Sequence, residues 1–147
     1  MTYKLFEHDR VKKFFKKHKK DKKLLLRITK KYCDILNNPY NAEFIELSSA
    51  KCPKCQRALV GSYRIIFFVS EKNNRIEIID IIKRKNDYRL FWAWGIIIRL
   101  NGVGDCIDEL SDDEADYYNE RIRRFENGDY TGTRKVDLNV IGKNLSK

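Results

Sequence analysis

The chain has 147 residues and a formal net charge of +10, with 31 Lys and Arg against 21 Asp and Glu. This length can bury a hydrophobic core without disulfides, so one domain, or one small domain with an appendage, is expected. The first twenty residues lack the apolar segment of a signal peptide, and the longest apolar run, Phe91–Ile98, is too short to cross a bilayer. A secreted or membrane-spanning protein is therefore not expected, and the sequence predicts a soluble, cytoplasmic one with reduced cysteines.

Basic residues are concentrated in the first part of the chain. Residues 1–91 contain 23 Lys and Arg against 10 Asp and Glu, whereas residues 92–147 contain 8 against 11. A basic body with an acidic tail favours a polyanionic partner for the first part. The alternative is a solvated basic face that binds nothing.

The first elements predicted along the chain are a strand at 3–7 and two amphipathic helices that form an antiparallel pair. Asp9 is expected to cap the first helix, and the second runs from Asp21 to the segment Asn37–Pro39. The face opposite the apolar stripe of the first helix, and the turn beyond it, are dense in lysine. This lysine run is either solvated or faces RNA, and it consists of Lys12, Lys13, Lys16, Lys17, Lys19, Lys20, Lys22 and Lys23.

A β-hairpin is predicted at the centre of the sheet. An extended segment at 44–47, a loop and a strand at 56–60 precede it. Tyr63–Val69 and Arg75–Ile82 are rich in β-branched and aromatic residues, and the polar segment between them forms a turn. Cations gather where the hairpin ends, which suits a site that holds phosphate in fixed geometry.

The last part of the chain contains the clearest helix. Phe91–Ile98 is apolar and must be covered by the sheet or by a partner. The segment Ser111–Glu126 has a capping box at its start, an apolar stripe at helical spacing and an Asn-Gly stop at 127–128. A weak strand is predicted at 135–141.

Two short motifs stand out at the hairpin. Gly61–Phe67 reads GSYRIIF, and Ile81–Tyr88 reads IIKRKNDY. In order and spacing they resemble the motifs G-x-YRI-[IV]-[YF] and I-x-x-[HK]-R-[KR]-x-x-Y of the RelE/ParE superfamily of type II toxins. The resemblance covers about residues 1–90.

The resemblance implies an α+β, RelE-like fold, in which an N-terminal strand and the helix pair pack on a small, mostly antiparallel sheet. Residues 1–91 would form the toxin domain. Residues 92–147 would form a C-terminal extension whose acidic amphipathic helix packs on the first part.

The resemblance also implies a function. RelE-like toxins are endoribonucleases that cut messenger RNA on the ribosome without a metal or other cofactor, by attack of a ribose 2′-hydroxyl on the adjacent phosphate. The expected partners are a cognate antitoxin, messenger RNA and the ribosome, with no membrane. By motif, the implied catalytic residues are Arg64, Arg84 and Tyr88, and the implied RNA-binding residues are Arg57, Lys83 and Lys85.

One position departs from the family pattern. RelE-like toxins often carry lysines on the strand before the Tyr-Arg motif, one of them proposed as the general base, whereas this chain has Arg57 and Leu59 there. The base is therefore unassigned. The alternative function is a non-catalytic RelE/ParE-fold module that binds RNA or a protein target such as gyrase. The alternative for Arg64 itself is a surface arginine at the strand end, paired with Glu77 or Asp80 across the hairpin.

The cysteines allow a further hypothesis. Cys52 and Cys55 are separated by two residues in a short loop and could present two thiolates to zinc. A structural zinc site needs four ligands, and the other candidates (Cys33, Cys106, His8 and His18) are scattered along the chain. The alternative is an inert or redox-active loop.

Overall fold

The computed structural model describes residues 3–41, 44, 51–83 and 110–138. Within these ranges the chain forms three helices and a five-stranded sheet, so the expected α+β class is confirmed. The helices are α1 (Asp9–Lys17), α2 (Lys22–Asn37) and α5 (Asp112–Glu126). The strands are β1 (Lys4–Glu7), β2 (Gln56–Val60), β3 (Tyr63–Ser70), β4 (Arg75–Lys83) and β5 (Arg134–Lys135).

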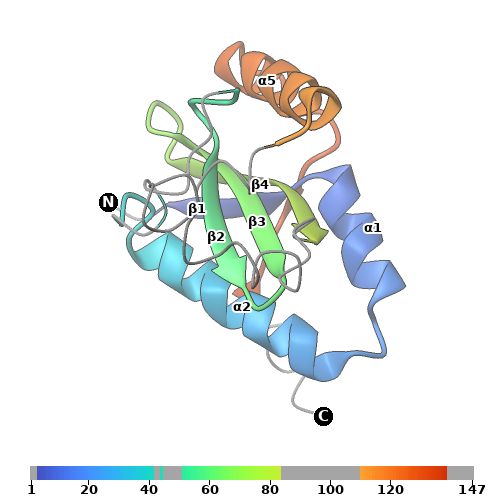
Figure 1. Ribbon diagram of the computed structural model, residues 1–147. Coiled ribbons are helices and arrows are strands. Elements are labelled where there is room, and N and C mark those ends of the chain that lie inside the picture. The colour runs from blue at the N-terminus through green and yellow to red at the C-terminus, as the bar shows by residue number, and fades with distance from the viewer. Residues whose placement is uncertain (1–2, 42–43, 45–50, 84–109, 139–147) are drawn as a thin grey trace, which may run out of the picture.

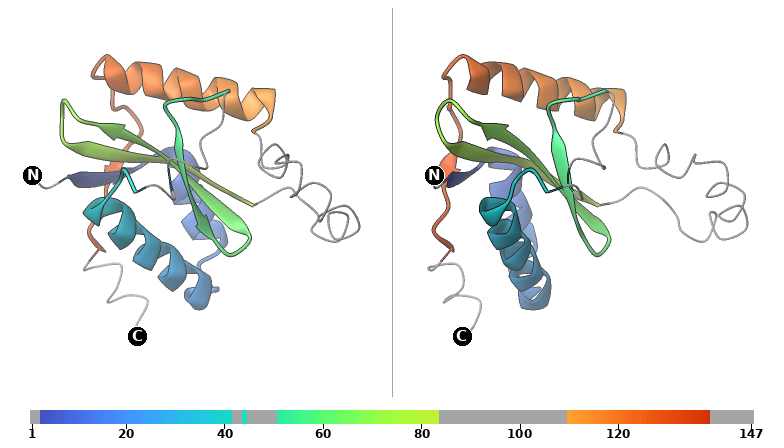
Figure 2. Two further views of the ribbon diagram at one scale, coloured as in Figure 1. Left: turned by 60° about the vertical axis from the view of Figure 1, so that its left-hand side comes forward. Right: turned by 90° about the vertical axis from the view of Figure 1, so that its left-hand side faces the viewer.

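The sheet has the strand order β2-β3-β4-β1-β5, and its pairings are antiparallel except for the parallel pair of β1 and β4. Helices α1 and α2 lie on one side of the sheet and α5 lies on the other (Figures 1 and 2). The molecule thus has three layers, with the hairpin β3–β4 in the middle one.

Each face of the sheet has its own core. Val11 of α1 and Ile28 of α2 pack with Ile65 and Phe67 of β3 on one side. Ile66 and Phe68 of β3 pack with α5 on the other side. Burying each of these side chains contributes roughly 1.5–3 kcal/mol to folding. Because side chains alternate along a strand, the face of every residue in β3 follows.

The predicted hairpin is confirmed, with one irregularity that the sequence did not indicate. Ile66 pairs with Asp80, but Phe67 pairs with Ile78. Ile79 therefore has no partner in β3 and forms a bulge in β4. Ile79 packs in the core beneath α5, and the side chain of Asp80 is bonded to α5 as well. The bulge therefore directs two successive residues towards the same helix.

The N-terminal ends of two of the three helices agree with the sequence prediction. Asp21 caps α2, because its carboxylate accepts a 3.1 Å hydrogen bond from the N–H of Leu24. The capping box of α5 between Ser111 and Glu114 is present. The expected cap of α1 was wrong: His8 occupies the N-cap position, and Asp9 is the first helical residue.

Two predicted elements lie partly or wholly outside the described residues. The apolar segment 91–98 lies wholly outside, and of the segment 44–47 only Phe44 is described, packed edge-on against Phe67. The strand predicted at 135–141 is wrong over its described part: β5 comprises Arg134 and Lys135, and Val136 and Asp137 belong to neither a helix nor a strand. No helix in the described part is long and apolar enough to cross a membrane.

Candidate functional site

Arg57 and Arg64 lie on the same face of the sheet. Arg57 pairs with Ile66, and Arg64 pairs with Leu59 on one side and Ile82 on the other. Ile66 belongs to the core beneath α5, so both arginines face the α5 side and are diagonal neighbours. The structure therefore places two of the predicted site residues together.

Both arginines are buried. Arg64 is 1% exposed and Arg57 is 4% exposed, which is unusual for residues whose predicted partner is a phosphate in solution. The two guanidinium groups can meet an RNA phosphate only if this face of the sheet becomes accessible.

Lys83 is separated from this pair. It pairs with Tyr63 at the end of β4, and so it faces the opposite side of the sheet from Arg64. Its side chain is exposed. Three other predicted site residues, Arg84, Lys85 and Tyr88, lie outside the described residues.

Asp80 is the centre of a polar network that joins three elements. The hydroxyl of Tyr118 in α5 donates a 2.8 Å hydrogen bond to Oδ2 of Asp80, and Nη1 of Arg10 in α1 lies 3.3 Å from the same oxygen. The backbone N–H of Ile81 donates to the other oxygen at 2.9 Å. The guanidinium of Arg10 also lies 3.6 Å from the ring centroid of Tyr117. The network holds α5 and the start of α1 against β4.

His8 makes a second connection between α1 and α5. Its backbone N–H donates to the carbonyl of Ile78 at 2.9 Å, and its Nδ1 lies 3.0 Å from the hydroxyl of Tyr117. The ring is 4% exposed and packs edge-on against Tyr117 and Phe125. Burial, with the nearby charge of Arg121, lowers the pKa of His8 to about 4. His8 is therefore neutral at pH 7.

His8 and Asp80 lie at different distances from Arg64 along the sheet. His8 is bonded beside Ile78, whereas Arg64 pairs with Ile82, and four residues of strand span roughly 13 Å. His8 is thus too distant to accept a proton beside a phosphate held by Arg64. Asp80 is two residues from Ile82 on the same side, and burial raises its pKa.

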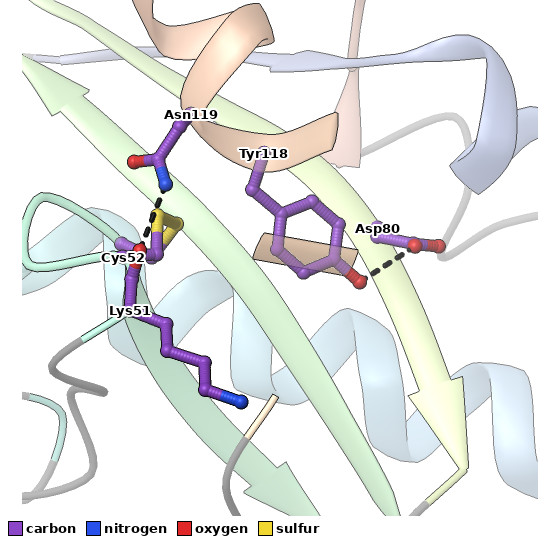
Figure 3. The surroundings of a disulfide bond; sticks show 6 residues. Lys51, Cys52, Asp80, Tyr118 and Asn119 are labelled. Carbon is purple, nitrogen blue, oxygen red and sulfur yellow. Dashed lines mark hydrogen bonds between the residues drawn. A yellow bond between two sulfur atoms is a disulfide. The ribbon is translucent and has the colours of Figure 1, made fainter. Parts of the chain in front are cut away.

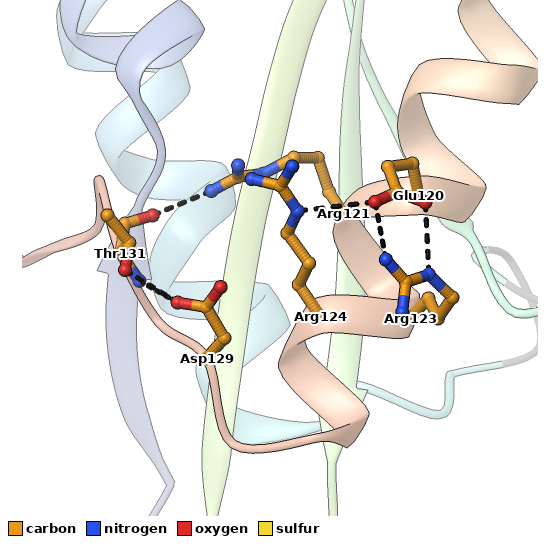
Figure 4. A network of polar contacts seen from close by, with 6 residues as sticks. All are labelled: Glu120, Arg121, Arg123, Arg124, Asp129 and Thr131. Atoms are coloured by element: carbon orange, nitrogen blue, oxygen red, sulfur yellow. Dashed lines mark hydrogen bonds and ion pairs between the residues drawn. The ribbon is translucent and has the colours of Figure 1, made fainter.

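A third polar group lies where α5 ends. Arg121 is buried and donates a 2.7 Å hydrogen bond to the carbonyl of Thr131, whereas Arg123 and Arg124 bind Glu120 on the exposed side of the helix (Figure 4). The neighbouring carboxyl of Glu77 is 1% exposed and accepts a 2.6 Å bond from Arg75. Burial raises the pKa of Glu77, and Arg75 opposes the increase.

Cys52 and Cys55 form a disulfide (Figure 3). The expectation of reduced cysteines is therefore wrong for this pair, and neither sulfur is a thiolate that could bind zinc here. The two residues are fully buried in the core beneath α5. Cys33 is free and exposed. Among the described residues, no group of three or more His, Cys, Asp or Glu side chains could hold a metal ion.

The sequence pattern identified the arginines but not the network around Asp80. Arg10 is in α1, and Tyr117 and Tyr118 are in α5. None of them has a motif around it, so only the packing of α1 and α5 on the sheet brings them together near Asp80. The capping box and the apolar stripe of α5 predicted the helix, but not the residues that it contacts.

Comparisons with known proteins give no independent assignment. No family model, no curated protein and no solved structure matches this chain.

Proposed function

We propose that the chain is a RelE-like toxin, an endoribonuclease that cuts messenger RNA on the ribosome and is neutralised by a cognate antitoxin. The observation that carries this proposal is the placement of Arg57 and Arg64 as diagonal neighbours on one face of the sheet, in the paired strands β2 and β3. The order of a strand, two helices, a strand and a hairpin agrees with the fold that the motif resemblance implies.

The proposed chemistry uses the two guanidinium groups as fixed cations. Attack of a ribose 2′-hydroxyl on the adjacent phosphate gathers negative charge on the phosphate oxygens, and preorganised arginines stabilise this charge without any change in their own protonation. Of the carboxyl groups that β4 places on the same face, Asp80 is nearer than Glu77 to Arg64 in the strand register. We assign Asp80 the role of proton acceptor once its bonds to Tyr118 and Arg10 are released. Arg84 would assist at the phosphate and Tyr88 would orient the nucleophile, as their motif implies.

The test is primer extension on ribosome-bound messenger RNA with purified Arg64→Met protein. Methionine keeps much of the buried volume of Arg64 but removes the charge, so cleavage should fall by about 100-fold or more. Arg75→Met is the matched control, because Arg75 is a partly buried arginine at the other end of the hairpin. Circular dichroism would verify the fold of both variants. Undiminished cleavage by Arg64→Met would remove the proposed site.

A second candidate is the non-catalytic module that binds RNA or a protein target such as gyrase. The burial of Arg57 and Arg64 favours it, because buried arginines can serve the fold alone. Primer extension separates the two candidates: defined cuts in the message support the enzyme, and retention of RNA without cuts supports the module.

A further inference from the structure

The disulfide loop is packed under α5. Cys52 and Cys55 precede β2 and share a core with the apolar stripe of α5, including Tyr118 and Ile122. Both cysteines are 0% exposed. In Figure 3 the disulfide lies beside β3, on the face of the sheet that α5 covers and from which Tyr118 reaches Asp80. Both sulfurs are therefore shielded from a reductant, and side chains of α5 form part of the shield.

The residues around the disulfide are also bonded to α5 and to Leu110, which lies two residues before the helix. The side chain of Asn119 donates a 2.8 Å hydrogen bond to the carbonyl of Lys51 (Figure 3). The amino group of Lys51 reaches the carbonyl of Leu110 at 3.2 Å and the carboxylate of Asp112 at 3.0 Å.

The loop is bonded to the far end of the helix as well. Lys54, between the two cysteines, donates to both carboxylate oxygens of Glu126 at 2.9 and 2.8 Å. Glu126 is the last residue of α5, and Asp112 is the first. The four-residue loop Cys52–Cys55 and the lysine before it are thus fastened to both ends of α5, so the conformation of the loop and the position of the helix depend on one another.

We propose that Cys52–Cys55 is a thiol–disulfide exchange site for a dithiol reductant, and that its reduction is coupled to release of α5 from the sheet. The disulfide keeps Lys51 and Lys54 in the positions from which they bind the helix. Reduction frees the loop and weakens the attachment of α5. By linkage, attachment of α5 opposes reduction to the same extent. In a reducing compartment, where lasting disulfides are rare, such a pair responds to the thiol supply.

The exchange proceeds in two balanced steps. One thiolate of the dithiol attacks a sulfur of the Cys52–Cys55 bond, so a mixed disulfide forms and the other cysteine leaves as a thiolate. The second thiol of the reductant then attacks the mixed disulfide and closes its own ring. Two electrons pass from the dithiol to the protein, and the two cysteines take up two protons.

The first test is the rate of reduction by dithiothreitol, followed by alkylation and mass spectrometry. Tyr118→Phe removes the hydroxyl that holds α5 to Asp80, so the pair should be reduced about five to ten times faster. Tyr32→Phe is the matched control. Its hydroxyl likewise donates to a buried carboxylate, that of Glu7 at 2.7 Å, but Tyr32 lies in α2 on the other side of the sheet.

Each outcome of this test is decisive. Faster reduction in Tyr118→Phe alone supports the coupling to α5. Equal acceleration in both variants would mean that global unfolding exposes the sulfurs, and equal rates in all three proteins would mean that α5 does not protect them. Either result overturns the proposal, as does a count of two free thiols at Cys52 and Cys55 in protein purified in air.

The second test measures the coupling in the other direction by hydrogen exchange. Because reduction makes release of α5 easier, the amides of α5 should exchange faster in the reduced protein than in the oxidised one. The exchange rates of amides in α2 should be the same in both. The double variant C52S/C55S should resemble the reduced protein. Identical exchange of α5 in the oxidised and reduced proteins would contradict the proposal. Neither test uses RNA, so the result is independent of the proposed nuclease function.

Discussion

At the scale of single residues, the ionisable groups beneath α5 contribute to the pH dependence of folding. His8 is buried in its neutral form, and burial lowers its pKa from 6.5 to about 4. In the unfolded chain the ring takes up a proton near pH 6.5. The unfolded state therefore binds one more proton than the folded state between these two values, and stability falls as the pH falls through this window.

The His8→Gln variant isolates this contribution. Between pH 6.5 and 4 the wild-type protein should lose up to about 3 kcal/mol of unfolding free energy from His8 alone, and the variant should not. Urea denaturation at several pH values measures the difference between the two proteins. The carboxyl groups of Glu77 and Asp80, whose pKa values are raised, act in the opposite sense, but they are present in both proteins and cancel. Parallel pH profiles would show that His8 is not buried as described.

The sequence predicted which residues would be of interest, but it did not predict their burial or their bonding. The Tyr-Arg motif identified Arg64 as a residue of interest, but a motif does not report burial. The exposure of Arg64 depends on what covers the face of the sheet, which is a property of tertiary packing. The disulfide was missed for a different reason: the expectation of a cytoplasmic protein predicted reduced cysteines, and the spacing of Cys52 and Cys55 alone does not distinguish a metal site from a bridge.

At the scale of elements, α5 depends on its first turn. The hydroxyl of Ser111 accepts a bond from the N–H of Glu114 at 3.2 Å, and the carboxylate of Glu114 accepts one from the N–H of Ser111 at 2.9 Å. Three acidic residues occupy this first turn, where the helix dipole favours them.

Replacing Ser111 with Ala should lower the unfolding free energy by about 1 kcal/mol, because one of the amide donors of the first turn loses its acceptor. Thermal denaturation would measure this as a lower Tm. Ser62→Ala is a suitable control, since Ser62 is exposed in the turn between β2 and β3. A Tm equal to that of the control would indicate that the cap does not support α5.

Element boundaries were more predictable than element contacts. The hairpin and α5 have strong local signals, namely strand-forming runs around a polar turn and a capping box before an apolar stripe. The bulge at Ile79 has no such signal, because each residue around it suits a strand. The parallel pairing of β1 with β4 could not be predicted either, since a short apolar strand carries no information about its neighbour.

At the scale of the whole molecule, charge is distributed unevenly. The α1–α2 side carries exposed lysines around the turn between the helices, including Lys16, Lys17 and Lys20. Such a surface attracts a polyanion whether or not the chain cuts it, because the affinity comes from displaced counterions.

Changing Lys16, Lys17 and Lys20 to Gln should weaken RNA binding at low salt and reduce the slope of log K against log salt by about 2, since roughly 0.7 counterions are released per neutralised phosphate of a single strand. Fluorescence anisotropy with a labelled RNA measures both quantities. The control removes the same charge elsewhere, at the exposed residues Lys4, Lys72 and Lys135. Equal losses in the two triple variants would show that net charge, rather than this surface, binds RNA.

The position of β1 has a consequence for the order in which the molecule folds. β1 lies between β4 and β5, and its residue Glu7 binds Arg134 across 127 residues of sequence. The strands of the hairpin β3–β4 are joined by a short loop, so they can pair as soon as both are made. β1 can pair only with β4 and β5, which are synthesised much later. Contacts of such high sequence separation are slow to form. During synthesis β1 therefore remains unpaired until β4 has emerged, and the sheet is completed only when Arg134 and Lys135 leave the ribosome.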